Sequence, residues 1–207
     1  DDAFVFASGE RAEAVERADL LAFKAEIDRF RADEALDELR ARTAGDFFAP
    51  ARYVLAHVLE RCDAPGLDIA WRSVLPIGAG LGSGAAASAA MAFAALRALG
   101  QTPDPTDVAT LAWQGDVIAH GGVASGLDSG ASALGGVTRY TLAASPHPTP
   151  VASGLDLTLV VADTGIQADT AEINTRVRRW LAAHPERMHL FADLGMLVSG
   201  GTAALER

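Results

Sequence analysis

The segment Pro76-Ile-Gly-Ala-Gly-Leu-Gly-Ser-Gly-Ala-Ala-Ala-Ser88 places four glycines directly before an alanine-rich run. Glycine adopts backbone conformations that other residues avoid and lets a ligand approach the main chain, whereas alanine is the strongest helix former. The segment therefore predicts a loop that opens into a helix. The first amides of such a helix have no intrahelical partner, and together with the positive end of the helix dipole they favour an anion. We interpret the segment as a phosphate-binding loop in a nucleotide site.

The residues on both sides of this loop predict the order strand, loop, helix. Residues 67–75 alternate apolar and polar side chains, which is typical of a strand. The helix after the loop is expected to end near Leu99-Gly100. Asp104-Pro105 predicts the start of the next helix, because Asp is a good N-cap and proline is favoured at the first helical position. This helix is expected to run to His120.

The remainder of the chain contains further helix and strand patterns. Residues 10–42 repeat apolar side chains every three or four positions, which predicts one or two amphipathic helices. A second glycine-rich segment follows the helix that ends at His120. We also predict a helix over residues 50–61, strands over 135–142 and 157–161, a proline-rich linker over 143–153 and a helix over 169–183.

Composition limits the class of protein. The chain has 207 residues, 50% of them hydrophobic, which is enough for a substantial core. Its net charge of −10 and pI near 4.8 argue against nucleic acid or an anionic membrane as partner. The single cysteine, Cys62, cannot form an internal disulfide. We find no signal-peptide pattern, and the apolar runs are too interrupted to predict a membrane span, so we expect a cytoplasmic protein.

Two common nucleotide-binding motifs fit poorly. A Walker A loop needs a lysine directly after its last glycine, but the only lysine, Lys24, lies in a predicted amphipathic helix. The sequence Gly80-Leu-Gly-Ser-Gly-Ala85 fits a relaxed dinucleotide fingerprint. The acidic residue expected about 20 positions later should end a second parallel strand. Its candidate, Asp104, instead lies in a proline-rich loop at a helix start.

Pro76-x-x-x-Gly80-Leu-Gly-Ser83 closely resembles the central phosphate-binding motif of the GHMP kinases. Within that family, His120-Gly121 followed by Ser125-Gly-Leu-Asp128 and Gly135-Gly136 is most similar to mevalonate kinases. Asp163-Thr-Gly165, which leads to Thr170 ahead of a helix, is similar to them as well. The resemblance covers roughly residues 52–179.

The resemblance implies an α+β, two-domain GHMP-kinase-like fold. Residues 1–150 would form an N-terminal ATP-binding and catalytic domain, and residues 151–207 the beginning of a C-terminal α+β domain. Neither the family's N-terminal lysine-bearing motif nor its C-terminal glycine-rich motif has a counterpart in this chain. The chain also begins at Asp1 without Met and ends without a closing strand or cap. We therefore expect a fragment with both domains incomplete, or a lineage in which catalysis has changed.

The resemblance also implies roles for individual residues. Asp128 would be the catalytic base, since phosphoryl transfer needs a carboxylate that takes or orients the acceptor proton. Mg²⁺ would be bound near Ser83 and Asp116, where the family normally has a glutamate at the second position. Ser125, Gly126 and Thr170 would contact the substrate. The ATP phosphates would be held by Gly78, Gly80, Leu81, Gly82, Ser83, Gly84 and Ala85.

Departures from the family pattern and structural alternatives stand beside these roles. Gly84 replaces a second serine, and one extra residue separates His120 from Ser125, with Ala124 where the family has proline. Asp128 could instead be a turn or cap residue, and Asp116 a solvated helix carboxylate. His120, Ser125 and Thr170 could serve only as caps or packing residues. Packing is the simplest role for the three tryptophans, Trp71, Trp113 and Trp180.

We expect an ATP- and Mg²⁺-dependent kinase that phosphorylates a hydroxyl of mevalonate, a small-molecule alcohol, with a homodimer as candidate assembly. One alternative is a kinase for another alcohol, such as phosphomevalonate, a sugar or homoserine, because the phosphate loop does not define the acceptor. A second is a non-catalytic nucleotide-binding homologue, consistent with Gly84, Asp116 and the missing motifs. A dinucleotide-binding oxidoreductase is a distant third.

Overall fold

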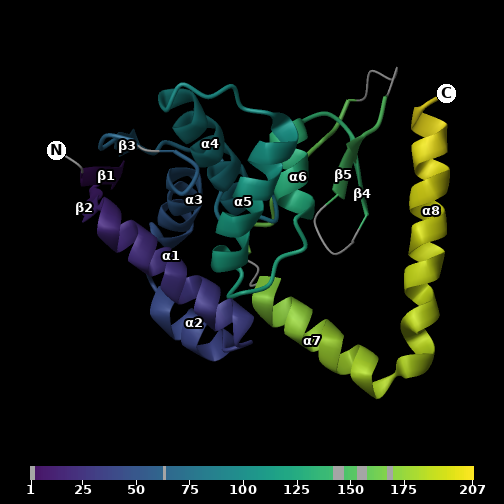
Figure 1. The fold of residues 1–207 in the computed structure, drawn as a ribbon. Coiled ribbons are helices and arrows are strands. Elements are labelled where there is room, and N and C mark those ends of the chain that lie inside the picture. Colours follow the sequence, from purple (N-terminus) through teal and green to yellow (C-terminus); the bar gives the residue numbers. More distant parts are fainter. Residues whose placement is uncertain (1–2, 63, 142–146, 153–157, 167–169) are drawn as a thin grey trace.

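The computed structural model describes residues 3–62, 64–141, 147–152, 158–166 and 170–207. Helices and short sheets occur together, which confirms the predicted α+β class (Figure 1). The elements are β1 (Ala3–Ser8), β2 (Arg11–Glu16), α1 (Arg17–Ala32), α2 (Leu36–Thr43), α3 (Ala49–Leu59), β3 (Asp68–Ala70), α4 (Ser83–Ala98), α5 (Pro105–Ala119), α6 (Leu127–Leu134), β4 (Thr138–Thr141), β5 (His147–Pro150), α7 (Thr170–Ala183), the 3₁₀ turn η1 (Pro185–Met188) and α8 (His189–Leu205).

The first sheet has three strands in the order β2-β1-β3. β1 pairs antiparallel with β2 and parallel with β3, and its side chains Phe4 and Phe6 are fully buried. The prediction of helix from residue 10 is therefore wrong for residues 11–16, whose alternation of charged and small apolar side chains suits a strand paired to β1. The predicted strand 67–75 is also too long. Only Asp68–Ala70 pairs with β1, and residues 71–75 are irregular.

Helices α1 and α2 confirm the remaining part of the amphipathic prediction. Leu20 and Ile27 of α1 and Leu39 of α2 are fully buried, as their helical spacing predicts. The helical backbone is interrupted between α1 and α2 at Glu34, which has a φ of 55°. A left-handed conformation is costly for a residue with a side chain and does not continue a helix, so the one long repeat becomes two helices.

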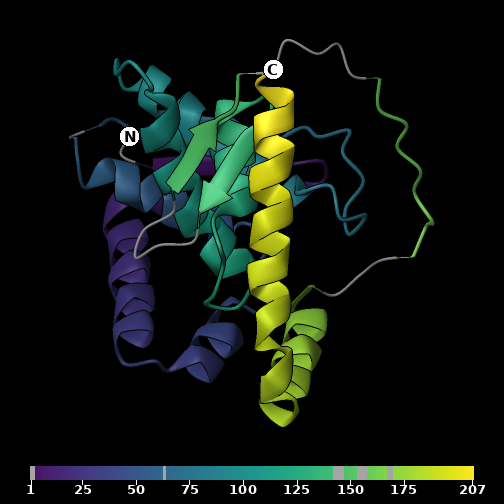
Figure 2. The same ribbon diagram turned by 90° about the vertical axis from the view of Figure 1, so that its right-hand side faces the viewer.

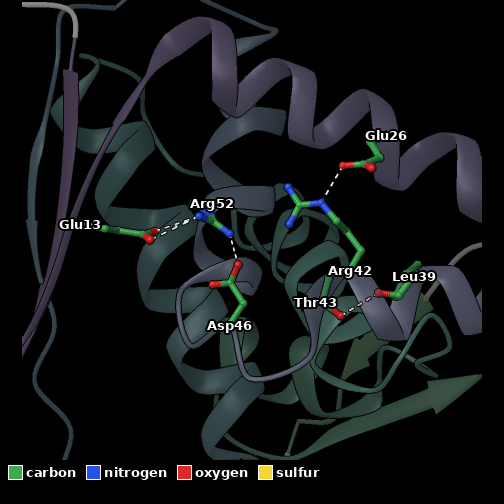
Figure 3. Close-up of polar contacts among 7 residues, drawn as sticks. All are labelled: Glu13, Glu26, Leu39, Arg42, Thr43, Asp46 and Arg52. Atoms are coloured by element: carbon green, nitrogen blue, oxygen red, sulfur yellow. Dashed lines mark hydrogen bonds and ion pairs between the residues drawn. The ribbon is translucent and has the colours of Figure 1, made fainter.

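Arginines fix the loop between α2 and α3 (Figure 3). Arg52 of α3 lies 3.2 Å from Oε1 of Glu13 on β2 and also pairs with Asp46 in the loop. Arg42 of α2 lies 2.8 Å from Oε2 of Glu26 on α1. Arg52 thereby ties the loop to the sheet, and Arg42 ties α2 to the first helix. It presents two phenylalanines, described below, to the candidate site.

The core lies where α3, α4 and α5 pack together on one side of the first sheet (Figures 1 and 2). α5 begins at the predicted N-cap: Oδ1 of Asp104 accepts hydrogen bonds from the amides of Thr106, at 2.9 Å, and Asp107, at 3.2 Å. Gly115 of α5 is the point of closest approach. A Cβ placed there would lie 2.8 Å from Cγ2 of Val54 and 2.9 Å from Cβ of Ser88. Only glycine therefore lets α5 approach both neighbouring helices this closely.

Replacing Gly115 with alanine is expected to destabilise the protein. Alanine favours a helix over glycine by up to about 1 kcal/mol, but overpacking a core typically costs about 1–3 kcal/mol. We expect a net loss of about 1–2 kcal/mol in the free energy of unfolding, measured by urea denaturation. Gly195→Ala in α8 is the matched control, because a Cβ there meets nothing within 4 Å. Equal stability of the two variants would contradict the tight packing at Gly115.

A polar cluster joins α1 to α3. Nζ of Lys24 lies 2.6 Å from Oδ2 of Asp28 and 3.0 Å from Oε2 of Glu60, and the hydroxyl of Tyr53 donates to Asp28. The ring of Tyr53 meets His57 edge-on at 4.6 Å. Burial, reinforced by the nearby charge of Lys24, lowers the pKa of His57 to about 4. His57 is therefore neutral in the folded protein at pH 7.

The lowered pKa of His57 predicts acid sensitivity. Between pH 6.5 and about 4 the unfolded chain binds a proton at His57 that the folded chain does not, so stability falls as the pH is lowered through this range. His57→Gln is expected to make the free energy of unfolding less dependent on pH in this window, measured by urea denaturation at several pH values. His184→Gln is the control, because His184 is exposed and directly follows α7. An unchanged slope in His57→Gln would contradict the assignment.

The second glycine-rich segment contains a helix that the sequence analysis missed. Residues 127–134 form α6, which packs against α4 and α5. Residues 147–150, predicted as linker, form β5 and pair with β4 in a two-stranded sheet. Gly130 brings α6 against this sheet, because a Cβ on it would lie 2.7 Å from Cβ of Pro148. Residues 143–146 and 153 of the predicted linker, and residue 142 at the end of the predicted strand 135–142, lie outside the described residues.

The side chains described from residue 158 to the C-terminus are almost all exposed. Residues 158–161 of the predicted strand 157–161 are irregular, so that prediction is wrong for its described part. α7 confirms the predicted helix over 169–183 to within one residue at its start. α7 and α8 meet at η1 and lie to one side of the other helices (Figures 1 and 2). Among the described residues, Pro185–Leu205 alone has the length and apolar composition of a membrane span, which is a weak indication of one.

Candidate active site

The predicted phosphate loop has the backbone of an anion-binding turn. Gly78, Gly80 and Gly82 have φ values of 79°, 74° and 64°, a region that other residues rarely occupy. Gly82 is the N-cap of α4, and its carbonyl accepts the first helical hydrogen bond from the amide of Ala86 at 2.9 Å. Loop and helix meet where the sequence predicts. Glycine has no side chain to cap the first turn, so the helix leaves its first amides to a ligand.

The first residues of α4 complete this end of the site. Ser83 and Ala85 begin the helix, with Ala85 buried, and Gly84 between them is exposed. A Cβ on Gly84 would meet only Cβ of Ala119 on α5, at 4.0 Å. The N-terminal end of α4 therefore adjoins the last turn of α5. Leu81, the remaining loop residue of the predicted set, is exposed.

Asp128 lies against this loop. It is in the first turn of α6, after the left-handed N-cap Gly126. A Cβ placed on Gly82 would lie 3.7 Å from Cβ and Cγ of Asp128 and 3.9 Å from its Oδ2. The fold thus brings together two residues that are 46 positions apart. The exposed carboxylate of Asp128 faces the start of α4, where the helix dipole favours negative charge.

Asp116 of α5 and His120, the C-cap residue of the same helix, form a pair near this point. Asp116 is only 3% exposed, so the alternative of a solvated carboxylate is wrong. Nδ1 of His120 lies 3.1 Å from Oδ1 of Asp116 and 2.9 Å from the backbone carbonyl oxygen of Asp116. The carboxylate raises the pKa of His120 to about 9, with a contribution from the charge of Asp128. His120 therefore carries a positive charge at pH 7 and partly balances the acidic groups.

The segment before Asp128 is held by side chains from two other elements. Nε1 of Trp113 on α5 donates to the carbonyl of Ala124 at 2.9 Å. The hydroxyl of Tyr140 on β4 donates to the carbonyl of Ser125, whose own hydroxyl accepts from the amide of Leu127 at 3.2 Å. Gly126, the N-cap of α6 that directly follows Ser125, is therefore held in position. The sequence analysis assigned Trp113 no role beyond packing and Tyr140 no role, since neither bond has a local signature.

An apolar cavity of about 320 Å³ adjoins the start of α4. The α2–α3 loop, the irregular chain after β3 and the last turn of α5 contribute to its wall. Because the loop is tied by Arg52, this wall is fixed. The sequence analysis missed its aromatic members in the α2–α3 loop. The main lining residues are Phe47, Phe48, Trp71, Ser83, Gly84 and Ala119.

Thr170 is not brought to this site by any described contact. It is the first residue of α7, and its side chain lies outside the described part of the chain. Ser125 and Gly126 do lie beside Asp128, and Gly126 is buried. The described residues contain no group of three or more His, Cys, Asp or Glu side chains that could hold a metal ion by themselves.

Comparison with known proteins shows the family of the chain. Residues 50–136 match the family described as GHMP kinases N terminal domain. The chain belongs to the GHMP kinases. The matched region includes α3, α4, α5 and α6, and so contains the glycine loop, Asp116 and Asp128. The resemblance seen in the motifs is therefore confirmed at family level.

Several curated mevalonate kinases are similar to the chain. The protein from Pyrococcus horikoshii is 31% identical over 174 residues, which are 83% of this chain and 50% of that protein. The Bos taurus protein is 33% identical over 139 residues, or 59% of this chain and 34% of its own length. The Aeropyrum pernix protein is 36% identical over 102 residues, or 49% and 31%. The chain spans about half the length of the proteins from Pyrococcus horikoshii and Thermococcus sibiricus.

Gly82→Ala is expected to weaken ATP binding at least tenfold. A left-handed conformation costs a residue with a Cβ about 1–2 kcal/mol, and the new methyl group would point toward Asp128. Affinity for ATP would be measured by calorimetric titration or with a fluorescent analogue. Gly200→Ala in α8 is the control, because Gly200 has a helical backbone and open space around it, and it should bind ATP like the wild type. Equal affinity in both variants would remove the loop from the nucleotide site.

Proposed function

We propose that this GHMP kinase chain is the nucleotide-binding and catalytic part of an enzyme that transfers the γ-phosphoryl group of ATP to a hydroxyl of mevalonate. The observation that carries the proposal is the approach of Asp128 to Gly82 at the N-terminal end of α4. A carboxylate at that place can take a proton from an acceptor while the helix amides hold a phosphate. The choice of acceptor is supported by the names of the relatives.

The residues present fit the phosphates of ATP. The positive-φ glycines expose backbone amides, and Gly82 leaves room where a side chain would approach Asp128. Ser83 adds a hydroxyl at the first turn of α4. When bound, ATP supplies the γ-phosphoryl group that the acceptor oxygen takes, with release of ADP. The residues from Gly78 to Ala85 would hold the phosphates and keep them beside Asp128.

The residues also fit Mg²⁺ bound mainly by phosphate oxygens and water. Mg²⁺ commonly uses only one or two protein carboxylates, so the lack of a larger acidic cluster in the described residues is compatible with it. Oδ1 of Asp116 is buried and has no hydrogen bond of good geometry, although His120 lies 3.1 Å away. Asp116 and Ser83 would hold the ion, which would neutralise phosphate charge during transfer.

Asp128 would act as the base on the acceptor. As the acceptor oxygen forms its bond to phosphorus, the hydroxyl proton passes to the Asp128 carboxylate. Ser125 and Gly126, which directly precede Asp128 on the sequence, would contact the acceptor, together with Thr170. Ser125 accepts a hydrogen bond from Leu127 and still has its own proton to donate. We place the enzyme in the cytoplasm with small-molecule substrates, with a second copy of the chain as candidate partner and neither nucleic acid nor membrane.

Two observations favour a second candidate. Asp116 is already engaged by the positive His120, and Gly84 lacks the hydroxyl of the family's second serine. A site of this kind can bind a nucleotide without turning it over. A binding-only homologue, or a kinase for another alcohol, is therefore the alternative to mevalonate phosphorylation.

The test is ADP release from Mg·ATP by the full-length gene product that contains this chain. We expect release to depend on mevalonate, and Asp128→Asn to reduce the rate at least 100-fold while ATP affinity stays within about twofold, since a general base contributes about 10²–10⁴-fold. Asp107→Asn, on the surface of α5, is the control for loss of a carboxylate.

Each result has a definite meaning. ATP binding without acceptor-dependent release from any alcohol would favour the binding-only homologue. Release with another alcohol but not with mevalonate would keep the kinase and change the acceptor. Unchanged turnover in Asp128→Asn would overturn the assignment of the base.

A further inference from the structure

Trp113 links helix α5, which carries Asp116, to the segment that leads to Asp128. It lies on α5, three residues before the buried Asp116, and its ring is partly buried. Its Nε1 does not bond to its own helix. It donates instead to the carbonyl of Ala124, eleven residues later, at 2.9 Å. One α5 helix thus carries a candidate metal ligand and also holds the segment that leads to the candidate base.

The segment that Trp113 holds needs an external support. Gly121 and Gly122 have φ values of 66° and 104°, so the chain leaves α5 through two residues with little conformational preference of their own. This is also where the chain carries one residue more than the related pattern, followed by Ala124 in place of a stiff proline. Two backbone hydrogen bonds fix the start of the path from α5 to α6: the amide of Gly121 donates to the carbonyl of Ile118 at 3.1 Å, and that of Gly122 to Val117 at 2.8 Å. Beyond Gly122, the carbonyls of Ala124 and Ser125 are held by side chains.

Two aromatic side chains supply such bonds from different elements. Trp113 binds the carbonyl of Ala124, and Tyr140 of β4 binds the carbonyl of the next residue, Ser125. Successive carbonyls are thus held by α5 and by the sheet. Gly126 follows as the left-handed N-cap of α6, and Asp128 is two residues further on. Any rotation of this segment would move the Asp128 carboxylate relative to Gly82.

Trp113 is itself held in place from α1. The guanidinium of Arg31 lies 5.7 Å from the centroid of the Trp113 ring. The same group donates to Oε1 of Gln114 at 2.7 Å and to the hydroxyl of Tyr53 at 3.0 Å. Arg31, which is held by these two hydrogen bonds, lies over the Trp113 ring and so restricts the orientation of the indole. A fixed donor of this kind suits positioning, because the productive geometry of a catalytic group must be held within a fraction of an ångström.

We propose that Trp113 is a positioning residue for Asp128: its indole N–H fixes the chain at Ala124 and so sets the start of α6 against the phosphate loop. The proposal rests on the proposed function for its effect on catalysis, but the restraint on the segment does not depend on that function. Trp113→Phe removes the N–H and keeps an aromatic ring in the core. Trp180→Phe is the matched control, since Trp180 is 45% exposed on α7 and stacks only on His184 among the described rings.

The first measurement is amide hydrogen exchange of residues 123–130 in the folded protein. We expect exchange in Trp113→Phe to be about three- to tenfold faster than in the wild type, with exchange of α3 and α4 unchanged, because loss of one hydrogen bond changes a local opening equilibrium by about that factor. Tyr140→Phe should affect the same residues from the other side. Wild-type exchange in Trp113→Phe would overturn the proposal, whether or not the protein is a kinase.

The second measurement separates positioning from general loss of structure. In the full-length gene product, Trp113→Phe should lower kcat for ADP release about tenfold, with the Kd for ATP within about twofold and the thermal midpoint close to that of Trp180→Phe. Equal losses in kcat and ATP affinity would show a merely structural role and overturn the proposal. If the wild type releases no ADP, the proposed function fails and the exchange experiment alone decides whether Trp113 restrains the segment.

Discussion

The close approach of two helix starts, α4 at Gly82 and α6 at Asp128, is the constraint on which the candidate site depends. A carboxylate and a phosphate loop can act together only if the backbone of the loop comes within a few ångströms of the acid. Gly82 makes this approach possible in two ways, because its left-handed backbone turns the loop into α4 and its missing side chain leaves space for Asp128. The other contacts around the site maintain this distance.

Helix α5 is the common support of these groups. Gly115 lets α5 pack tightly against α3 and α4, which fixes the position of α4 relative to α5. The same helix buries Asp116 and presents Trp113 to the segment before α6. A helix that is rigidly packed on one side can hold functional groups precisely on the other, whereas a loop alone cannot. The charged cluster between α1 and α3 and the Arg31 contacts extend this support to the N-terminal helices.

The electrostatic balance of the site follows from the same arrangement. The chain as a whole is strongly acidic, yet the proposed function requires the site to accept a polyanion. Backbone amides, the dipole of α4 and the protonated His120 supply local positive potential without adding a lysine to the loop. Asp116 and Asp128 remain separate carboxylates, one buried and paired and one exposed. This difference in environment is what allows distinct roles to be proposed for them.

The sequence by itself determined the α+β class, the glycine loop opening into α4, the Asp104-capped start of α5 and the GHMP kinase family, because each depends on local backbone preference or on a contiguous motif. It failed for residues 11–16, 127–134 and 147–150, whose strand or helix state depends on β1, on α4 with α5, and on β4. Only the tertiary structure decided that Asp128 meets Gly82, that Asp116 is buried against His120, and that Trp113 and Tyr140 hold successive carbonyls. These contacts join residues from separate elements, and their energies depend on distances in space that no local pattern encodes.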